Sequence, residues 1–317
     1  MEKNKKKFSL FCSITATCII AISTIQKLIF WKANLKKIEQ PLQKHIYPWK
    51  EGNVCYSVYG TGRPLLLLHN TEIGASSIEW QNNIKSLSRI YQVFVPDLPG
   101  FGESQKPKIT YTAYQYALFI NHFIEDVIQR PAFVIGSSAS ADFALMAYAL
   151  KSKNIRKLVL ISPTGLEKTL PTKKENYKRM ILQCPILGTH FFILSASKKA
   201  IKKQLTQYFF FSKEMVTKEL IDNYYTMAHK GKEHSRFSFA SVHTNFTSVD
   251  IQKVLKDIKI PFCVIWGENN KKNIAQHLKE IEALRHDGTY YLFENTRMLP
   301  HYENSEVFNE TVHSFLQ

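Results

Sequence analysis

Short apolar runs alternate with helical patterns along most of the chain. Asn53–Tyr59 alternates apolar and polar residues, as a half-buried strand does. Six further runs are apolar almost throughout: residues 64–68, 92–95, 132–135, 157–161, 262–266 and 289–293. Runs of this length are typical of strands buried on both faces, and most are followed by apolar residues at helical spacing. The pattern therefore predicts an α/β fold with a mostly parallel central sheet and helices on both faces.

The alternation stops between residues 166 and 250. Helical patterns follow one another there, including Ala200–Phe211 and Glu214–His229. We therefore expect a core made of residues 51–165 and 251–317, with 166–250 inserted as a helical cap. A cap over the carboxyl ends of the strands would cover the edge where open α/β sheets bind ligands.

The N-terminal region has the pattern of a membrane anchor. Residues 1–7 form a basic tail with four lysines, and Phe8–Ile25 contains eighteen residues without a charge. Eighteen residues just meet the length for spanning, and no A-x-A-like cleavage site closes the run. Residues 8–30 are therefore predicted to be a single anchor in a membrane, with a signal sequence as the alternative, and 31–50 a linker. Lysines on both sides leave open which side the body occupies.

Charge is distributed unevenly along the chain. The net charge of +16 includes +8 within residues 1–50 and +9 within 166–260. No stacking-aromatic or groove-helix motif accompanies the lysines, so nucleic acid is not an expected partner. We expect the N-terminal segment to contact membrane lipid, and we interpret the internal excess as a solvated surface.

The five cysteines contain no C-x-x-C pair. The sequence therefore indicates neither a zinc site nor a disulfide framework, and we expect no metal or cofactor. The cysteines are interpreted as small core residues. The oligomeric state is left open.

One candidate for chemistry lies in Pro131–Leu150. A buried strand breaks at Gly136-Ser137-Ser138-Ala139-Ser140 and continues as a helix. Strand, small-residue turn and helix is the context in which a G-x-S-x-G motif exposes a nucleophile, although the second glycine is Ser140 here. Ser138 is the candidate nucleophile. The alternative is an ordinary turn with incidental serines.

Five segments, in order, resemble motifs of the α/β-hydrolase superfamily. They are Leu65–His69, Pro96–Ser104, Gly136–Ser140, Ile265–Glu268, and Leu299–Glu303 with Phe308-Asn309. The resemblance covers about residues 51–317 and is strongest to a capped subset with an L-P-H-x-E ending. It implies the α/β-hydrolase fold and acyl transfer through a serine, a histidine and an acid.

The chain departs from this pattern at two of the three triad positions. The acid position is Asn270, and the first histidine position of the ending is Met298. The oxyanion loop, H-G in the family, begins His69-Asn70-Thr71. Ser138 alone stands where the resemblance places a triad residue.

A serine hydrolase with a relocated base is one hypothesis for the function. Ser138 would attack a carbonyl, and His301, one helical turn beyond Met298, would take its proton. Asn270 would orient the imidazole, with Glu268 as an alternative acid. The N–H groups of Ala139 and of Asn70 or Thr71 would hold the oxyanion. The expected substrate is a small apolar ester, thioester or amide.

A non-catalytic, membrane-anchored binding protein on a degenerate hydrolase scaffold is the alternative hypothesis. The loss of two triad positions and of the oxyanion-loop glycine favours it. A dehalogenase of the same fold would need a carboxylate at Ser138 and is excluded on that ground.

Overall fold

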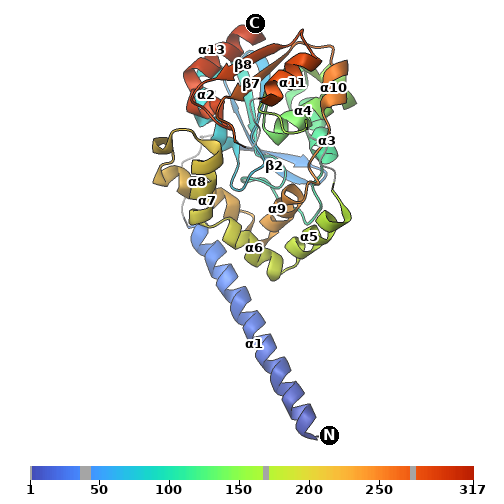
Figure 1. The fold of residues 1–317 in the computed structure, drawn as a ribbon, viewed down its shortest axis with the longest axis vertical. Helices are drawn as coiled ribbons and strands as arrows, with labels where there is room; N and C mark the ends of the chain where they lie inside the picture. Colours follow the sequence, from blue (N-terminus) through green and yellow to red (C-terminus); the bar gives the residue numbers. More distant parts are fainter. Residues whose placement is uncertain (1, 36–43, 167–170, 272–275) are drawn as a thin grey trace.

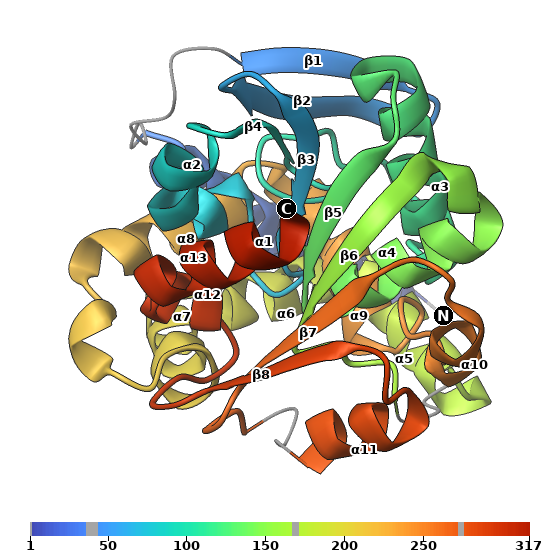
Figure 2. The same ribbon diagram turned by 90° about the horizontal axis from the view of Figure 1, so that it is seen from above.

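A single eight-stranded sheet forms the centre of the protein (Figures 1 and 2). The computed structural model describes residues 2–35, 44–166, 171–271 and 276–317. The strands are β1 (Lys44–Trp49), β2 (Gly52–Tyr59), β3 (Arg63–Leu68), β4 (Tyr91–Pro96), β5 (Ala132–Ser137), β6 (Ile155–Ile161), β7 (Phe262–Gly267) and β8 (Thr289–Phe293). Their order is β1-β2-β4-β3-β5-β6-β7-β8, and all pairs from β4 to β8 are parallel. The predicted α/β fold is confirmed.

Helices cover both faces of the sheet, and Figure 2 shows the two layers on either side of the strands. The core helices are α2 (Gln81–Leu87), α3 (Ala113–Phe123), α4 (Ala139–Leu150), α10 (Gln252–Asp257), α11 (Gln276–Leu284), α12 (Pro300–Glu303) and α13 (Ser305–Leu316). Leu66 and Leu68 pack towards α3 and α4, whereas Leu65 and Leu67 pack towards α2 and α13. Because successive strand residues point to opposite faces, a strand apolar throughout requires this double cover.

Short helical turns join several of these elements. They are η1 (Ser77–Trp80), η2 (Ile124–Ile128), η3 (Ser152–Asn154), η4 (Leu205–Phe209), η5 (Lys213–Met215) and η6 (Lys232–His234). η2 extends α3, and η1 leads directly into α2. The turn η1 carries Glu79, whose carboxylate contacts His301 of α12.

Part of the expected linker forms a strand. Residues 44–49 are β1, which pairs antiparallel with β2 through a tight turn. Tyr47 and Trp49 are buried and contact Phe123 and Phe119 of α3 edge to face. Burial of these two aromatic rings against α3 stabilises residues 44–49 as a strand of the sheet. The prediction of a linker, which was based on the prolines, is wrong for these residues. Residues 36–43, also in the expected linker, lie outside the described residues.

The described residues of the segment predicted to be the cap form several helices, and the segment is called the cap from here on. It consists of α5 (Lys173–Gln183), α6 (Leu187–Ser195), α7 (Lys198–Gln204), α8 (Lys218–His229) and α9 (Ser235–His243), with the turns η4 to η6 between them. Arg297, in the loop before α12, donates to the carbonyl oxygens of Thr206, Gln207 and Phe210 in the cap. The cap is therefore held to the same loop that precedes His301.

A long N-terminal helix, α1 (Glu2–Ala33), projects from the body (Figure 1). Residues Ser13–Ala33 within it are long and apolar enough to cross a membrane. Its last turns dock on the cap: Phe30 is buried against Phe192 of α6 and His229 of α8. The C-terminus lies at the opposite end of the body.

Candidate active site

Ser138 lies in a strained turn between β5 and α4. Its backbone has φ 56° and ψ −125°, a conformation that non-glycine residues rarely adopt. The turn is tight: a Cβ on Gly136 would come within 2.6 Å of the Ala141 nitrogen and the Ser140 carbonyl oxygen. Ser138 N–H donates to the Ile161 carbonyl at 2.8 Å, which ties the turn to β6. Such strain costs roughly 1–3 kcal/mol and is typical of functional sites.

Ser140, at the second glycine position of the motif, has a role of its own. It is fully buried, and its hydroxyl donates to the carbonyl oxygen of His69 at 2.5 Å. This bond links the start of α4 to the end of β3, from which the oxyanion loop departs. A serine is therefore both small enough and useful at this position.

His69 is a structural residue of that loop. Leu98 N–H donates to His69 Nε2 at 2.9 Å, so Nε2 is the acceptor and Nδ1 carries the hydrogen that it donates to the Asn70 carbonyl. Burial lowers the pKa of His69 and keeps the ring neutral. With both nitrogens engaged, His69 has no nitrogen left to accept a proton from Ser138.

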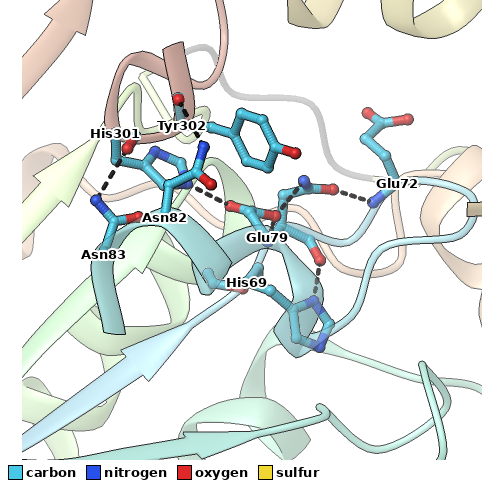
Figure 3. A network of polar contacts seen from close by, with 9 residues as sticks. His69, Glu72, Glu79, Asn82, Asn83, His301 and Tyr302 are labelled. Carbon is cyan, nitrogen blue, oxygen red and sulfur yellow. Dashed lines mark hydrogen bonds and ion pairs between the residues drawn. The ribbon is translucent and has the colours of Figure 1, made fainter. Parts of the chain in front are cut away.

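The structure pairs His301 with a carboxylate that the sequence analysis did not select. His301 is fully buried, and its Nε2 lies 3.0 Å from Glu79 Oε1 (Figure 3). Its ring stacks near Trp80, with ring centres 4.4 Å apart, and Asn83 Nδ2 donates to its carbonyl at 2.9 Å. Within the described part of the chain, His301 Nδ1 has no hydrogen-bond partner.

Glu79 connects His301 to the oxyanion loop. Its Oε2 accepts from the N–H of Asn70 at 3.0 Å and from Asn70 Nδ2 at 2.5 Å. Asn70 Oδ1 in turn accepts from Glu72 N–H at 2.7 Å, so the network in Figure 3 runs from the loop to α12. Burial alone would raise the pKa of Glu79, but its hydrogen bond with His301 outweighs burial, and the pKa lies below its usual value.

Nothing in the sequence marks Glu79. It is one glutamate before a tryptophan, in a segment that belongs to none of the five motifs. Only the packing of η1 against α12 brings its carboxylate to His301. Two segments more than 200 residues apart in the chain thus form the pair.

The two degenerate triad positions, Met298 and Asn270, have surroundings of their own. Met298 is buried with Phe209, Phe210, Leu299 and Tyr302, so a thioether packs among hydrocarbon where the family has its histidine. Asn270 is buried in the loop after β7, where its N–H donates to the Gly267 carbonyl at 3.1 Å.

The alternative acid lies away from His301. Glu268 is exposed to solvent. Its backbone N–H donates to the Phe293 carbonyl at 3.0 Å, which places it beside the end of β8. The carboxylate that His301 meets is therefore Glu79.

Two of the predicted oxyanion donors keep free N–H groups. Ala139 is the first residue of α4, and the N–H groups in the first turn of a helix have no partner within that helix. Thr71 N–H makes no hydrogen bond with any residue of the described ranges. Asn70 N–H is engaged with Glu79, which leaves Thr71 as the donor from this loop. The Ser138 hydroxyl itself bonds to no described residue.

A small cavity lies between the core and the cap, and neither Ser138 nor His301 is among the residues that line it. It has a volume of about 30 Å³ and lies beside Thr71, lined by Gly100 and Phe101 of the core and by Phe192 and Phe239 of the cap. This volume suits a single water molecule. A larger cavity of about 380 Å³ lies between β2, β4 and α2, and Ser138 is not among the residues that line it. Among the described residues, no cluster of three His, Cys, Asp or Glu side chains is placed to hold a metal ion.

Comparison with known proteins assigns the family. The family of the alpha/beta hydrolase fold matches residues 64–305, and the chain belongs to it. Among curated relatives, a 2-hydroxy-6-oxo-6-phenylhexa-2,4-dienoate hydrolase of Burkholderia cepacia is 22% identical over 265 residues, covering 81% of this chain and 88% of its own. An uncharacterized hydrolase of Bacillus subtilis (strain 168) is 24% identical over 270 residues, covering 84% and 94%.

Solved structures show the same fold. A His-tagged serine hydrolase involved in carbazole degradation superposes with a TM-score of 0.70 and 20% identity, over 86% of this chain and 98% of its own. A membrane phospholipase A, described as a bacterial virulence factor, also has a TM-score of 0.70, with 19% identity over 100% of this chain and 98% of its own. The predicted membership of the α/β-hydrolase superfamily is confirmed.

Proposed function

We propose that this protein is a serine hydrolase that cleaves an apolar ester, thioester or amide by acyl transfer through Ser138. The observation that carries the proposal is the retained turn. Ser138 holds a positive φ, its hydroxyl is not committed to a structural hydrogen bond, and the N–H of Ala139 stands beside it. A protein that had lost the reaction would have no physical need to keep a side chain in this strained position.

His301 is the proposed base, with Glu79 in the role of the acid. One imidazole nitrogen is held by a carboxylate at 3.0 Å and the other has no partner among the described residues. A base oriented in this way is the arrangement that activates a serine. The Glu79 carboxylate stabilises an imidazolium, which the neutral amide of Asn270 would not do. The contact between Ser138 Oγ and His301 Nδ1 forms, in this proposal, when substrate opens the cap.

The reaction would proceed in two steps. Ser138 Oγ attacks the carbonyl carbon while its proton passes to His301, and the N–H groups of Ala139 and Thr71 stabilise the oxyanion. The proton then passes to the leaving group as the acyl-enzyme forms. Water attacks the acyl-enzyme in the second step and releases the acid, with His301 again taking and returning the proton.

We also propose that α1 anchors the protein in a membrane and that the substrate comes from lipid. Ser13–Ala33 has the length and composition of a spanning segment. The membrane phospholipase A resembles this chain over its whole length, α1 included. An apolar acyl ester would suit the hydrocarbon side chains Phe101, Phe192 and Phe239 that surround the cavity beside Thr71.

A second candidate function is binding without catalysis. It is favoured by Met298, which fills the family's histidine position with a buried thioether, and by the absence of an imidazole bonded to Ser138 within the described residues. In that case the scaffold would hold an acyl ligand that it does not cleave.

Labelling of the full-length protein with a fluorophosphonate probe tests the proposal. In nonionic detergent we expect covalent labelling of Ser138, abolished in Ser138→Ala. General base catalysis contributes typically 10²–10⁴-fold, so His301→Gln should slow labelling by roughly 10²-fold or more. Glu79→Gln should also lower the rate of labelling. His313→Gln, in α13 next to Tyr91, is the matched control and should label at the wild-type rate.

The Met298→His/Asn270→Asp double variant separates the two candidate functions. It restores the family triad on the same scaffold. If the wild type is not labelled at any pH while the double variant is, the wild type is a binding protein. Labelling of the wild type that is unaffected in folded His301→Gln would assign the base elsewhere. Turnover of p-nitrophenyl esters, lost in Ser138→Ala, completes the test, since labelling alone does not show hydrolysis.

A further inference from the structure

Two helices of the cap expose apolar side chains to solvent. On α6, Leu187, Phe191 and Leu194 are 59%, 47% and 55% exposed. Their spacing of four and three residues places them on one face of the helix. On α5, Tyr177, Met180 and Ile181 are likewise exposed. We name these six residues the cap apolar face. An exposed apolar surface of this kind marks an interaction site more often than single exposed residues do.

The helix α1 leaves the body beside this face. Gln26 Nε2 donates to the carbonyl of Ile186, one residue before α6 begins, at 3.1 Å. Phe30 is buried against Phe192 on the opposite side of α6. Towards the N-terminus from Gln26, Ile25, Ile22 and Ile20 are exposed. Figure 1 shows α5 and α6 at the end of the body from which α1 projects.

Exposed basic residues lie in the same stretch of the chain as the cap apolar face. Residues 171–204 contain eight Lys or Arg and one Glu. Lys173, Lys174 and Lys178 of α5 are exposed, as are Lys199, Lys202 and Lys203 of α7. Apolar side chains flanked by lysines fit the boundary between acyl chains and anionic headgroups, where each lysine contributes about 1 kcal/mol.

We infer that the cap apolar face lies on the surface of an anionic phospholipid bilayer, so that the cap as well as α1 contacts the membrane. The inference rests on the proposed anchoring by α1. Because Phe30 is buried against the cap, the spanning part of α1 would be the uncharged run Phe8–Ile25 rather than all of Ser13–Ala33. Gln26, which is hydrogen-bonded to Ile186, then lies at the level of the headgroups together with the start of α6. The six exposed side chains then leave water for lipid, which is favourable by roughly 25 cal/mol per Å² of apolar area.

This placement gives the cap a position relative to the substrate. Phe192 of α6 lines the cavity beside Thr71 on the inner side of the helix, while Leu187, Phe191 and Leu194 face outwards. A lipid acyl chain would therefore have only the thickness of the cap helices to cross between the bilayer and the cavity beside Thr71. The internal positive charge, which the sequence alone suggests is simply solvated, has a partner in this arrangement.

Site-specific fluorescence in proteoliposomes tests the inference. The background is the full-length protein with Cys12→Ser, Cys18→Ser and Cys184→Ser. One new cysteine, Leu187→Cys or Leu194→Cys, is introduced and labelled with the fluorophore NBD. The labelled protein is reconstituted in vesicles of POPC and POPG at 3:1. We expect emission shifted to shorter wavelength, strong quenching by nitroxide lipids and weak quenching by aqueous iodide. Omitting POPG should reduce the nitroxide quenching. Equal quenching in both vesicles would overturn the anionic part of the inference.

Two reference positions make the outcomes distinct. Leu150→Cys, at the exposed end of α4, should be quenched by iodide alone. The native Cys18, labelled with Cys12 and Cys184 replaced, reports on α1 itself and should be quenched by lipid. If Cys18 is in lipid but positions 187 and 194 are in water, this inference fails while the anchor stands. If Cys18 is also in water, the anchoring proposal fails. Protection of 187 and 194 from both quenchers would mean that a second copy covers the face, and would also overturn the inference.

Discussion

Asp142 lies in the first turn of α4, four residues after Ser138, and is buried without a cationic partner among its hydrogen bonds. Its carboxylate accepts from the N–H of Thr164 at 3.1 Å and from the Thr164 hydroxyl at 2.5 Å. Burial raises the pKa of Asp142 to about 7, although these hydrogen bonds oppose the shift. A carboxyl whose pKa is raised by folding stabilises the folded state at low pH, below its unfolded pKa of about 3.9. That stability is lost as pH rises towards about 7.

The Asp142→Asn variant should remove this pH dependence. We expect the variant and the wild type to have similar melting temperatures at pH 4.5, and the variant to melt higher at pH 8. Three pKa units correspond to a difference on the order of 4 kcal/mol. Thermal melting in nonionic detergent at the two pH values measures the effect. The exposed Asp250→Asn is the control and should change neither value. If the melting temperature of Asp142→Asn, compared with that of the wild type, were lower at pH 8 than at pH 4.5, the raised pKa of Asp142 would be contradicted.

At the scale of elements, two charged side chains join the cap to the core. Arg297 donates to the carbonyls of Thr206, Gln207 and Phe210 around the end of η4. Glu303 of α12 accepts from the N–H groups of Phe211 and Arg297, at 2.6 and 2.7 Å. Carbonyl groups at a helix end have no partner within the helix, so a guanidinium there satisfies several at once. The loop before His301 is therefore hydrogen-bonded directly to the cap.

Replacing Arg297 by Met should loosen the cap locally. We expect amide hydrogen exchange in residues 204–211 to accelerate roughly tenfold or more, because a hydrogen bond from a charged group contributes about 1.5–3 kcal/mol. Exchange is measured by mass spectrometry on the intact protein.

Arg285 offers a matched control for this experiment. It donates in the same way to the carbonyls of Leu255, Lys256 and Ile258 at the C-terminal end of α10, in the core. Arg285→Met should accelerate exchange in residues 252–258 and leave 204–211 unchanged. If the two variants produced the same pattern, the effect of Arg297→Met would be global destabilisation.

At the scale of the whole molecule, α1 is both a separate projection and a part of the cap. Its last turns contribute Phe30 to a small apolar cluster with Leu182, Phe192, Ala228 and Phe239. Asn34 Nδ2 donates to the His229 carbonyl at 3.1 Å, which fixes the end of the helix to α8. The region that carries the helix therefore depends on it for packing, and removal of α1 would expose the inner cluster of the cap.

Neighbouring residues at the end of α1 distinguish its two roles. Phe30 is 2% exposed and Trp31 is 64% exposed. Phe30→Ala should lower the melting temperature of the detergent-solubilised protein by several degrees. Replacing a buried Phe by Ala lowers the free energy of unfolding by about 3–5 kcal/mol. Trp31→Ala should change it little, as surface substitutions typically fall within about 0.5 kcal/mol. Equal effects of the two substitutions would show that α1 does not pack on the cap in solution.

Local patterns predicted most of the fold. Apolar runs predicted the strands from β3 to β8, and helical spacing of apolar residues predicted helices between residues 166 and 250. Both signals depend on residues that are neighbours in the chain. The β1 strand was missed: its proline and lysine are typical of a linker, and only the rings of Phe119 and Phe123 make its burial favourable. The roles predicted for Ser138, His301, Asn270, Asn70, Thr71 and Ala139 in catalysis stay predictions.

The sequence by itself determined the α/β-hydrolase fold, the strained turn at Ser138 and an N-terminal segment long enough to cross a membrane. Each of these depends on residues that are close together in the chain. Only the tertiary structure decided that His301 meets Glu79, that Met298 lies among aromatic rings, and that α1 ends on the cap. These are contacts between segments far apart in sequence, where the choice of partner depends on how whole elements pack.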